Sequence, residues 1–255
     1  MSEPVVAPHY DSIDFRKIKV GLQNLEDAIL DLGSLKKNNR TYADKNFILK
    51  ALAQKDYATQ RLVSQYFYDI SGIYERLCKY FAFLYRYDYY VTPYIIEDDK
   101  LKEDKVLTEF ARILTYLDNS NLKKVFGDIA LKVIRDGCYY GYWVDTKDCM
   151  TIQELPTDYC RSRYFKAGMP AIEFNMRFFD DKFPDAVYRM KILKMFPEDF
   201  QEGYLLYKRH KLMGDGIGDS EGWYLLDTAA AFKFNLNGSD MPILVNSIPT
   251  LIDLD

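Results

Sequence analysis

The sequence predicts an α+β fold, in which a helical N-terminal half is followed by a β-rich half of mixed or antiparallel strands. Up to Ile134, apolar residues recur every three or four positions, which is the period of an amphipathic helix. From Gly137 onward, short runs rich in Tyr, Phe and Val alternate with clusters of Gly, Asp and Pro. Helices first and strands afterwards, without sustained βαβ alternation, are typical of α+β proteins.

Three regions are expected along the 255 residues. They are an N-terminal arm with a first helix over 1–40, a helical region over 41–136 and a β-rich region over 137–255. The last two are expected to form one domain, 41–255, because a chain of this length can bury a large core. The first helix is expected at 20–34, where a helical apolar spacing ends at Gly33.

The helical region is expected to contain four stretches. "TYAD", Thr41 to Asp44, predicts a capping box in which the Thr41 hydroxyl accepts from an N–H of the first turn. The longest apolar stripe follows, and Ser71-Gly72 interrupts it, which predicts two helices or one kinked helix. The residues of this stripe are Leu62, Tyr66, Ile70, Ile73, Leu77, Tyr80 and Leu84. Two further helices are expected over 106–117 and 122–134, with Gly137 as the C-terminal cap.

Six runs in the second half are expected to be strands. Between them a short helix is expected at 183–194 or 196–204, where Pro and acidic residues open each stretch. The expected strands are "CYYGYWV" (138–144), "MTIQEL" (150–155), "AIEFNMRFF" (171–179), "EGYLLYKRHK" (202–211), "GWYLLD" (222–227) and "AAAFKF" (229–234).

The run "GCYYGYWVD", Gly137 to Asp145, gathers four aromatic rings. On a strand, Tyr139 and Trp143 face away from Tyr140 and Tyr142, whereas a stacking platform needs its rings on one side. A sheet covered on both faces is therefore favoured over a binding platform. Gly141 is expected to allow a bulge or the close approach of another backbone.

Composition narrows the possible functions. The net charge is −4 and the pI is near 5.4, which does not suit tight sequence-neutral binding of nucleic acid. The four cysteines form no CxxC pair and only two histidines are present, so no structural metal is expected. The N-terminus does not resemble a signal peptide, and no apolar stretch approaches 18 residues. We expect a soluble protein that is made in the cytoplasm and carries no membrane span.

Two segments are candidate sites. "YKRHK", Tyr207 to Lys211, is the densest basic cluster, and Lys208, Arg209 and Lys211 could contact phosphates, although a solvated strand end is favoured. "MGDGIGDSEG", Met213 to Gly222, could offer acids to calcium at Asp215, Asp219 and Glu221, but it lacks the patterns of nucleotide loops and EF-hands. A hairpin loop is favoured there. No catalytic motif is present, so no catalytic, cofactor or metal residue is expected, and the chain is predicted not to be an enzyme.

Several segments, in order, resemble the portal proteins of tailed bacteriophages. They are "YATQRLVSQYFYDISGIYERLCKYFAFLYRYDYYVTPY" (57–94), "KVIRDGCYYGYWVD" (132–145), "IQELPTDYCRSRYFKAGMPAIEFNMRFFD" (152–180) and "MPILVNSIPTLIDLD" (241–255). The resemblance covers roughly 40–255 and implies the α+β wing region on the outer side of a portal ring. In that family the last segment leads into the stem helix, so the chain is expected to end before the stem, clip and crown.

The resemblance implies a ring, typically of twelve copies, at the unique capsid vertex of the virion. Double-stranded DNA passes through such a ring during packaging and ejection. The implied partners are other copies of the chain, the major capsid protein, the terminase large subunit and a head-tail connector or adaptor protein. Two alternatives remain open: a metal-dependent nucleic-acid- or sugar-modifying enzyme using Asp215 to Glu221, and another ring protein of the head-tail junction.

Overall fold

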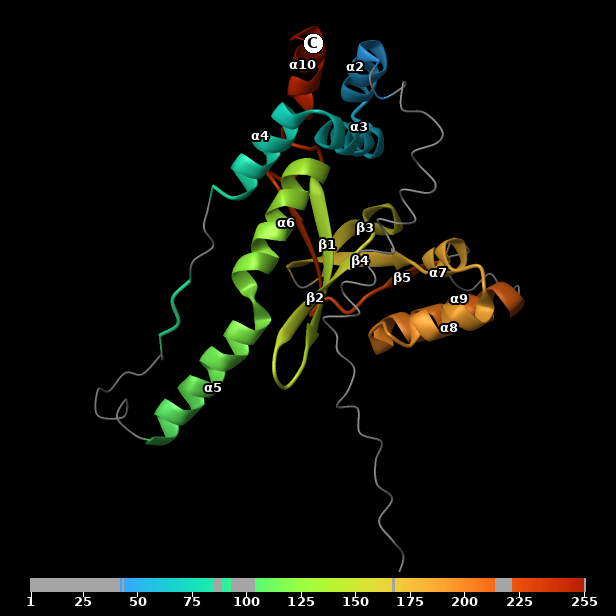
Figure 1. Cartoon of the computed structure of the whole chain (residues 1–255). Helices are drawn as coiled ribbons and strands as arrows, with labels where there is room; N and C mark the ends of the chain where they lie inside the picture. The colour runs from blue at the N-terminus through green and yellow to red at the C-terminus, as the bar shows by residue number, and fades with distance from the viewer. Residues whose placement is uncertain are drawn as a thin grey trace, which may run out of the picture. The chain divides into compact units, whose positions relative to one another are not determined.

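In the part of the chain that the structure describes, five α-helices precede the first strand, and further helices lie between and after the later strands (Figure 1). This computed structural model describes residues 42, 44–84, 89–92, 104–166, 168–213 and 222–254, all within the compact unit Asn39–Asp255. The predicted α+β class is confirmed. The expected helix at 20–34, the arm before it, Thr41 and the acidic loop at 214–221 lie outside the described residues.

The helices before the first strand are α2 (Lys45–Ala53), α3 (Tyr57–Ile70), α4 (Gly72–Ala82), α5 (Asp104–Ser120) and α6 (Leu122–Asp136). The predicted break at Ser71-Gly72 is confirmed, because Ser71 ends α3 and caps α4. The predicted capping box is wrong: Asp44 caps α2, and its carboxylate accepts from the Asn46 N–H at 2.9 Å. Gly137 ends α6 with φ of 87°, as expected of a C-terminal glycine.

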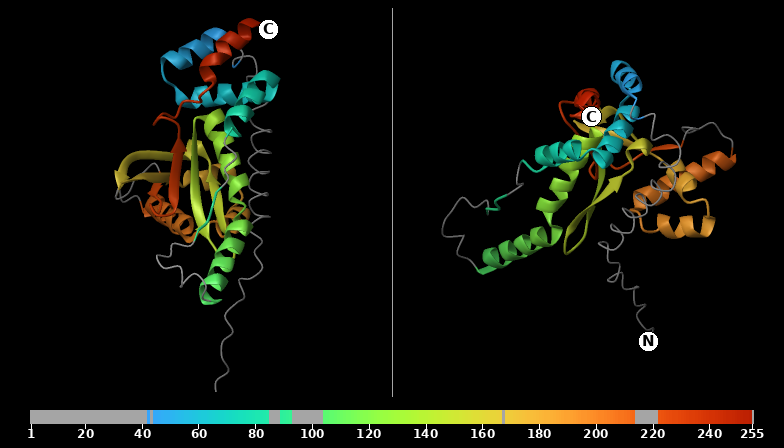
Figure 2. Two further views of the ribbon diagram at one scale, coloured as in Figure 1. Left: turned by 90° about the vertical axis from the view of Figure 1, so that its left-hand side faces the viewer. Right: turned by 45° about the horizontal axis from the view of Figure 1, so that its top comes forward.

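One core joins the helices to the end of the described chain. The short helix η3 (Val245–Ser247) and α10 (Ile248–Leu254) return to α2 and α3, and α2 and α10 lie side by side (Figure 2). Lys45 Nζ bonds the Asp253 carboxylate at 2.6 and 2.7 Å. The buried members of this core are Ile48, Val63, Phe67, Tyr74, Cys78, Ala82, Ile134, Val245 and Ile248.

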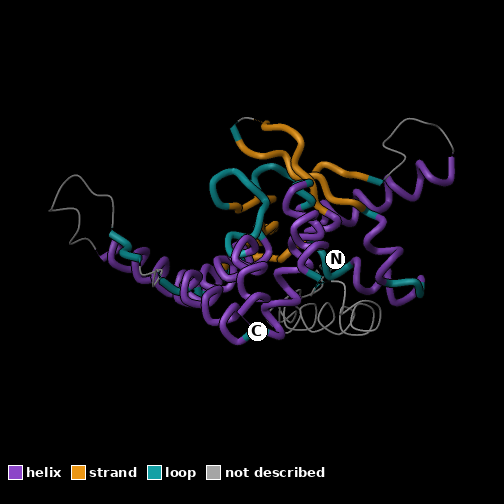
Figure 3. Tube along the Cα trace, turned by 90° about the horizontal axis from the view of Figure 1, so that it is seen from above, coloured by secondary structure: helices purple, strands orange, loops and turns teal. Residues whose placement is uncertain are grey.

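The strands form two antiparallel three-stranded sheets (orange in Figure 3). The first has the order β2-β1-β6, with β1 at Cys138–Asp145, β2 at Met150–Leu155 and β6 at Ala231–Asn235. The second has the order β3-β4-β5, with β3 at Cys160–Lys166, β4 at Met169–Asn175 and β5 at Trp223–Leu225. The turn η2 (Thr157–Tyr159) joins β2 to β3.

Strand β1 is buried on both faces, as predicted for the aromatic run. On one face Tyr139 packs with Ile129 and Val133 of α6. On the other, the Tyr142 ring lies 5.1 Å from the Phe200 ring. The rings are therefore divided between two packed faces, and the run does not form a one-sided stacking platform.

Two of the strand predictions are wrong in whole or in part. Residues 202–211 belong to the helix α9 (Glu198–Met213), and 177–179 belong to α7 (Arg177–Lys182) rather than to β4. The stretch at 183–194 forms α8 (Ala186–Leu193), so both expected positions for a short helix are helical. Aromatic packing explains these helices: Phe178, Phe179 and Phe200 meet Phe174 of β4 with ring centroids 5.2 to 6.1 Å apart.

A glycine is needed at position 141 because the Phe232 side chain fills the space of a Cβ there. The prediction of a bulge or of a closely approaching backbone was wrong. Gly141 pairs with Phe232 of β6, and a Cβ at position 141 would lie 2.4 Å from Cζ of that ring and 2.9 Å from Cε1 of Tyr139. The missing side chain leaves room for the Phe232 ring to stack on Tyr139.

We expect Gly141→Ala to lower the free energy of unfolding by about 1–3 kcal/mol, because the added methyl overpacks the Phe232 and Tyr139 rings. Urea denaturation followed by circular dichroism measures the loss. Gly72→Ala is the matched control: nothing lies within 4 Å of a Cβ there, so its stability should stay equal or rise slightly. Equal stability of both variants would contradict this packing.

Candidate functional site

The outer side of α3 and α4 exposes the apolar stripe that the sequence predicted. Ile70, Ile73 and Tyr80 are 57%, 61% and 63% exposed, while Tyr66 and Leu77 are half-buried. The set Leu62, Ile70, Ile73, Tyr80 and Leu84 is called the α3–α4 outer face. The buried residues of the same two helices form a second set, which includes Val63, Phe67, Tyr74 and Cys78.

A polar network fixes which side of α3 and α4 is buried. The Ser64 hydroxyl donates to the Arg135 carbonyl and lies 2.8 Å from the Tyr74 hydroxyl, which therefore donates to it. The Arg135 guanidinium pairs with Asp136 at 2.7 and 2.8 Å and lies over the Tyr68 ring. Burial raises the pKa of Tyr74, so its hydroxyl stays protonated as a donor. These bonds hold the inner side against α6 and leave the outer face turned outward.

The basic cluster at 207–211 lies on α9 and is partly engaged inside the chain. Lys208 Nζ bonds both carboxylate oxygens of Asp180 at 2.7 Å, so this predicted phosphate contact is neutralised by a neighbouring helix. Arg209 is exposed on α9, and the side chain of Lys211 lies outside the described residues. The structure thus does not present Lys208 and Arg209 as a pair of free cations.

Asp180 is the centre of a polar cluster within the aromatic core. It accepts from the Tyr204 hydroxyl at 2.9 Å, and Arg189 lies 3.4 Å away. Burial raises the pKa of the Asp180 carboxyl, but the hydrogen bonds from Lys208 and Tyr204 and the nearby cations outweigh it, so the pKa is lowered overall. Burial and Asp180 raise the pKa of Tyr204. The arrangement satisfies every charge locally, which is typical of a structural ion pair.

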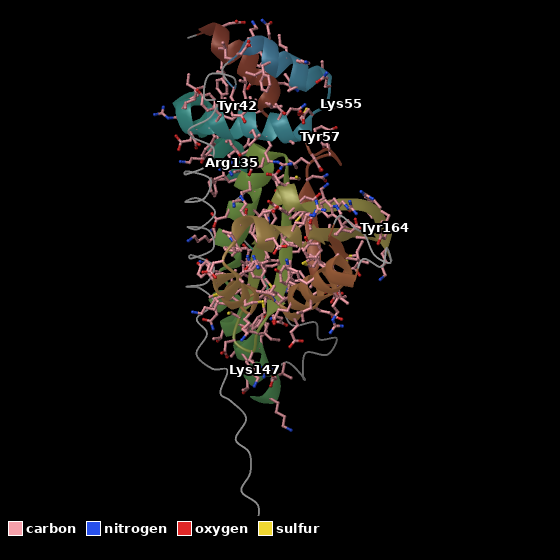
Figure 4. All side chains as sticks on the ribbon, turned by 90° about the vertical axis from the view of Figure 1, so that its right-hand side faces the viewer. Tyr42, Lys55, Tyr57, Arg135, Lys147 and Tyr164 are labelled. Carbon is pink, nitrogen blue, oxygen red and sulfur yellow. The ribbon has the colours of Figure 1, made fainter. Side chains whose placement is uncertain are left out.

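The hairpin of β3 and β4 carries cations and apolar side chains at its tip, a surface that sequence reasoning missed. Arg163 and Lys166 are exposed, and Phe165 is 75% exposed. Figure 4 shows Tyr164 at the outer end of this hairpin. The basic and aromatic residues of "RSRYFK" were present in the sequence, but their exposure depends on the β3–β4 pairing, which the sequence does not reveal.

The described ranges contain no candidate metal site and no helix suited to cross a membrane. No group of three or more His, Cys, Asp or Glu residues there is placed to hold a metal ion. Asp215, Asp219 and Glu221 of the acidic loop lie outside those ranges. Among the described helices, none combines the length and the apolar character needed to cross a bilayer.

Comparison with known proteins found no matching family model, no matching curated protein and no matching solved structure.

Replacing Asp180 by Asn should lower the free energy of unfolding at pH 7 by about 1.5–3 kcal/mol, because charge-assisted bonds to Lys208 and Tyr204 are lost. The folded pKa lies below the ordinary 3.8, so the carboxylate stabilises the fold above that value and this contribution is lost as pH falls through the folded pKa. Urea denaturation at pH 7 and at pH 3 measures this. The difference in the free energy of unfolding between wild type and variant should be smaller at pH 3. Asp148→Asn, at an exposed residue of the β1–β2 turn, is the control; an equal effect there would contradict the role of Asp180.

Proposed function

We propose that this chain is a structural, non-enzymatic portal protein of a tailed phage. In this proposal, copies of the chain form a ring, of about twelve as in the family that the sequence resembles, at one capsid vertex of the virion. Double-stranded DNA passes through the ring, and the major capsid protein, the terminase large subunit and a head-tail connector bind around it. The proposal rests on the ordered segments that resemble portal proteins and on one observation of the fold.

That observation is the exposure of the α3–α4 outer face. Apolar side chains on α3 and α4 are exposed to solvent, although both helices already bury another set of apolar residues in the core. Contiguous exposed apolar patches on soluble chains mark interaction surfaces. A second copy of the chain is the partner that a ring requires, and repeated head-to-tail contact closes such a ring.

The charge of the chain agrees with a conduit for DNA. A net charge of −4 per copy makes the assembled ring acidic. Each phosphate held by a cation adds an ionic contact that must be broken when DNA moves, so sparse cations favour passage over retention. The engagement of Lys208 by Asp180 removes one cation from such contacts.

We expect Ile73→Glu to weaken ring assembly of the purified chain by roughly tenfold or more, because an exposed Ile loses about 1.5 kcal/mol or more of burial at the interface. Negative-stain electron microscopy and analytical ultracentrifugation over a range of concentrations measure it. Leu49→Glu is the control: Leu49 is a similarly exposed residue of α2, and its variant should assemble normally.

Twelvefold rings with a central hole would support the proposal. A wild-type chain that stays monomeric at all concentrations would contradict it, as would rings that form equally well with Glu at position 73.

A further inference from the structure

The tip of the β3–β4 hairpin combines apolar exposure with positive charge. Phe165 and Met169 are 75% and 54% exposed, and Tyr164 beside them is also exposed. Within the described part of the chain, Arg163 and Lys166 form no ion pair. The hairpin 160–175 contains three cations and one acid, a charge of +2, which leaves −6 (−4 − 2) for the remainder of the chain.

The pairing of β3 with β4 changes register just before this tip. Ser162 pairs with Ile172 and Phe165 pairs with Pro170, so three steps along β3 match two along β4. A bulge of this kind bends the strand and re-aims its side chains. Before the bulge, Ser162 lies opposite the fully buried Ile172; beyond it, Phe165 is solvent-exposed. The rings of Tyr164 and Phe165 at the tip are thus open to solvent.

The first half of α9 offers the opposite charge beside an apolar side chain. Glu198, Glu202 and Leu205 follow at intervals of four and three residues, so they lie on one side of the helix. Leu205 is 51% exposed, and neither glutamate forms an ion pair within the described ranges. Phe200, between the two glutamates, packs on Phe174 with ring centroids 5.2 Å apart.

Within the described part of the chain, no ion pair joins the tip to the α9 glutamates. Phe174 lies five residues along β4 from Met169 at the tip, which is about 16 Å at ~3.3 Å per residue. The α9 glutamates flank Phe200, which packs on Phe174 near the end of β4, whereas Lys166 pairs with Met169 at the start of this strand. Two unpaired charged surfaces of opposite sign, each with an exposed apolar residue, remain available to another molecule.

We propose that the hairpin tip of one copy docks on the Glu198–Glu202–Leu205 side of α9 in the next copy. In this contact Phe165 covers Leu205, while Arg163 and Lys166 face the two glutamates. The contact is heterologous, and repetition extends it from copy to copy. This inference rests on the proposed function, since it specifies one contact of the proposed ring.

Double-stranded DNA fits the tip less well than a second copy does. The two cations of the tip could bind phosphates. The bases of a duplex, however, are stacked on one another inside it, so Phe165 and Tyr164 would find no base to stack on. An acidic surface with an exposed leucine satisfies both the charge and the apolar character of the tip.

Site-directed cross-linking tests the contact. Phe165→Cys and Leu205→Cys are made in separate full-length chains, each with Cys149→Ser, because Cys149 is the one half-buried native cysteine among buried Cys78, Cys138 and Cys160. The two chains are mixed at assembly concentration with a short bismaleimide. We expect a cross-linked dimer at least tenfold more abundant than with Leu49→Cys in place of Leu205→Cys. Equal yields would overturn the proposal.

A charge exchange provides the second arm. Arg163→Glu with Lys166→Glu should abolish the cross-link, and Glu198→Lys with Glu202→Lys in the other chain should restore it. A ring that forms while no cross-link appears overturns this contact and leaves the portal proposal standing; a chain that never assembles overturns both. Loss of salt-dependent retention on a DNA duplex in Arg163→Ala/Lys166→Ala, without a cross-link, would assign the tip to nucleic acid instead.

Discussion

The burial of β1 on both faces is the constraint on which the rest of the fold depends. Its Tyr139 side is covered by α6, and its Tyr142 side meets Phe200 of α9. Because α6 also packs on α3 and α4, one strand ties the helical half to the aromatic core of the second half. The helices α6 and α9 each bury one side against β1. Their opposite sides are left to contact other elements or other molecules.

The sequence was sufficient for the fold class and for most element positions, because period and turn residues are local signals. The break at Ser71-Gly72, the end of α6 at Gly137 and both strands of the β1–β2 hairpin follow from such signals. The strand prediction at 202–211 was wrong because this part of α9 has four consecutive aromatic or leucine residues, 204–207. Such a run shows no helical stripe. Its helical state depends on packing against Phe174 and Phe179, which no local pattern reveals.

The candidate surfaces show the same limit. Helices α3 and α4 carry apolar residues on two sides, and the sequence cannot say which side is buried; the Ser64–Tyr74–Arg135 network decides it. Lys208 looked available in the sequence, yet its partner Asp180 is 28 residues away along the chain. The exposed tip at Phe165 lies just beyond a one-residue shift in the β3–β4 pairing, and strand pairing is not encoded by local sequence.

Helix α5 is joined to the strands through its C-terminal turn. The Tyr116 hydroxyl bonds Asp145, Asn119 donates to the Asp148 carbonyl and the Ser120 hydroxyl accepts from the Met150 N–H. The whole 17-residue helix is about 25 Å long, and most of its described side chains are exposed. A force that acts on α5 near Leu107 would therefore reach the β1–β2 turn through these bonds, and from there the central strand β1.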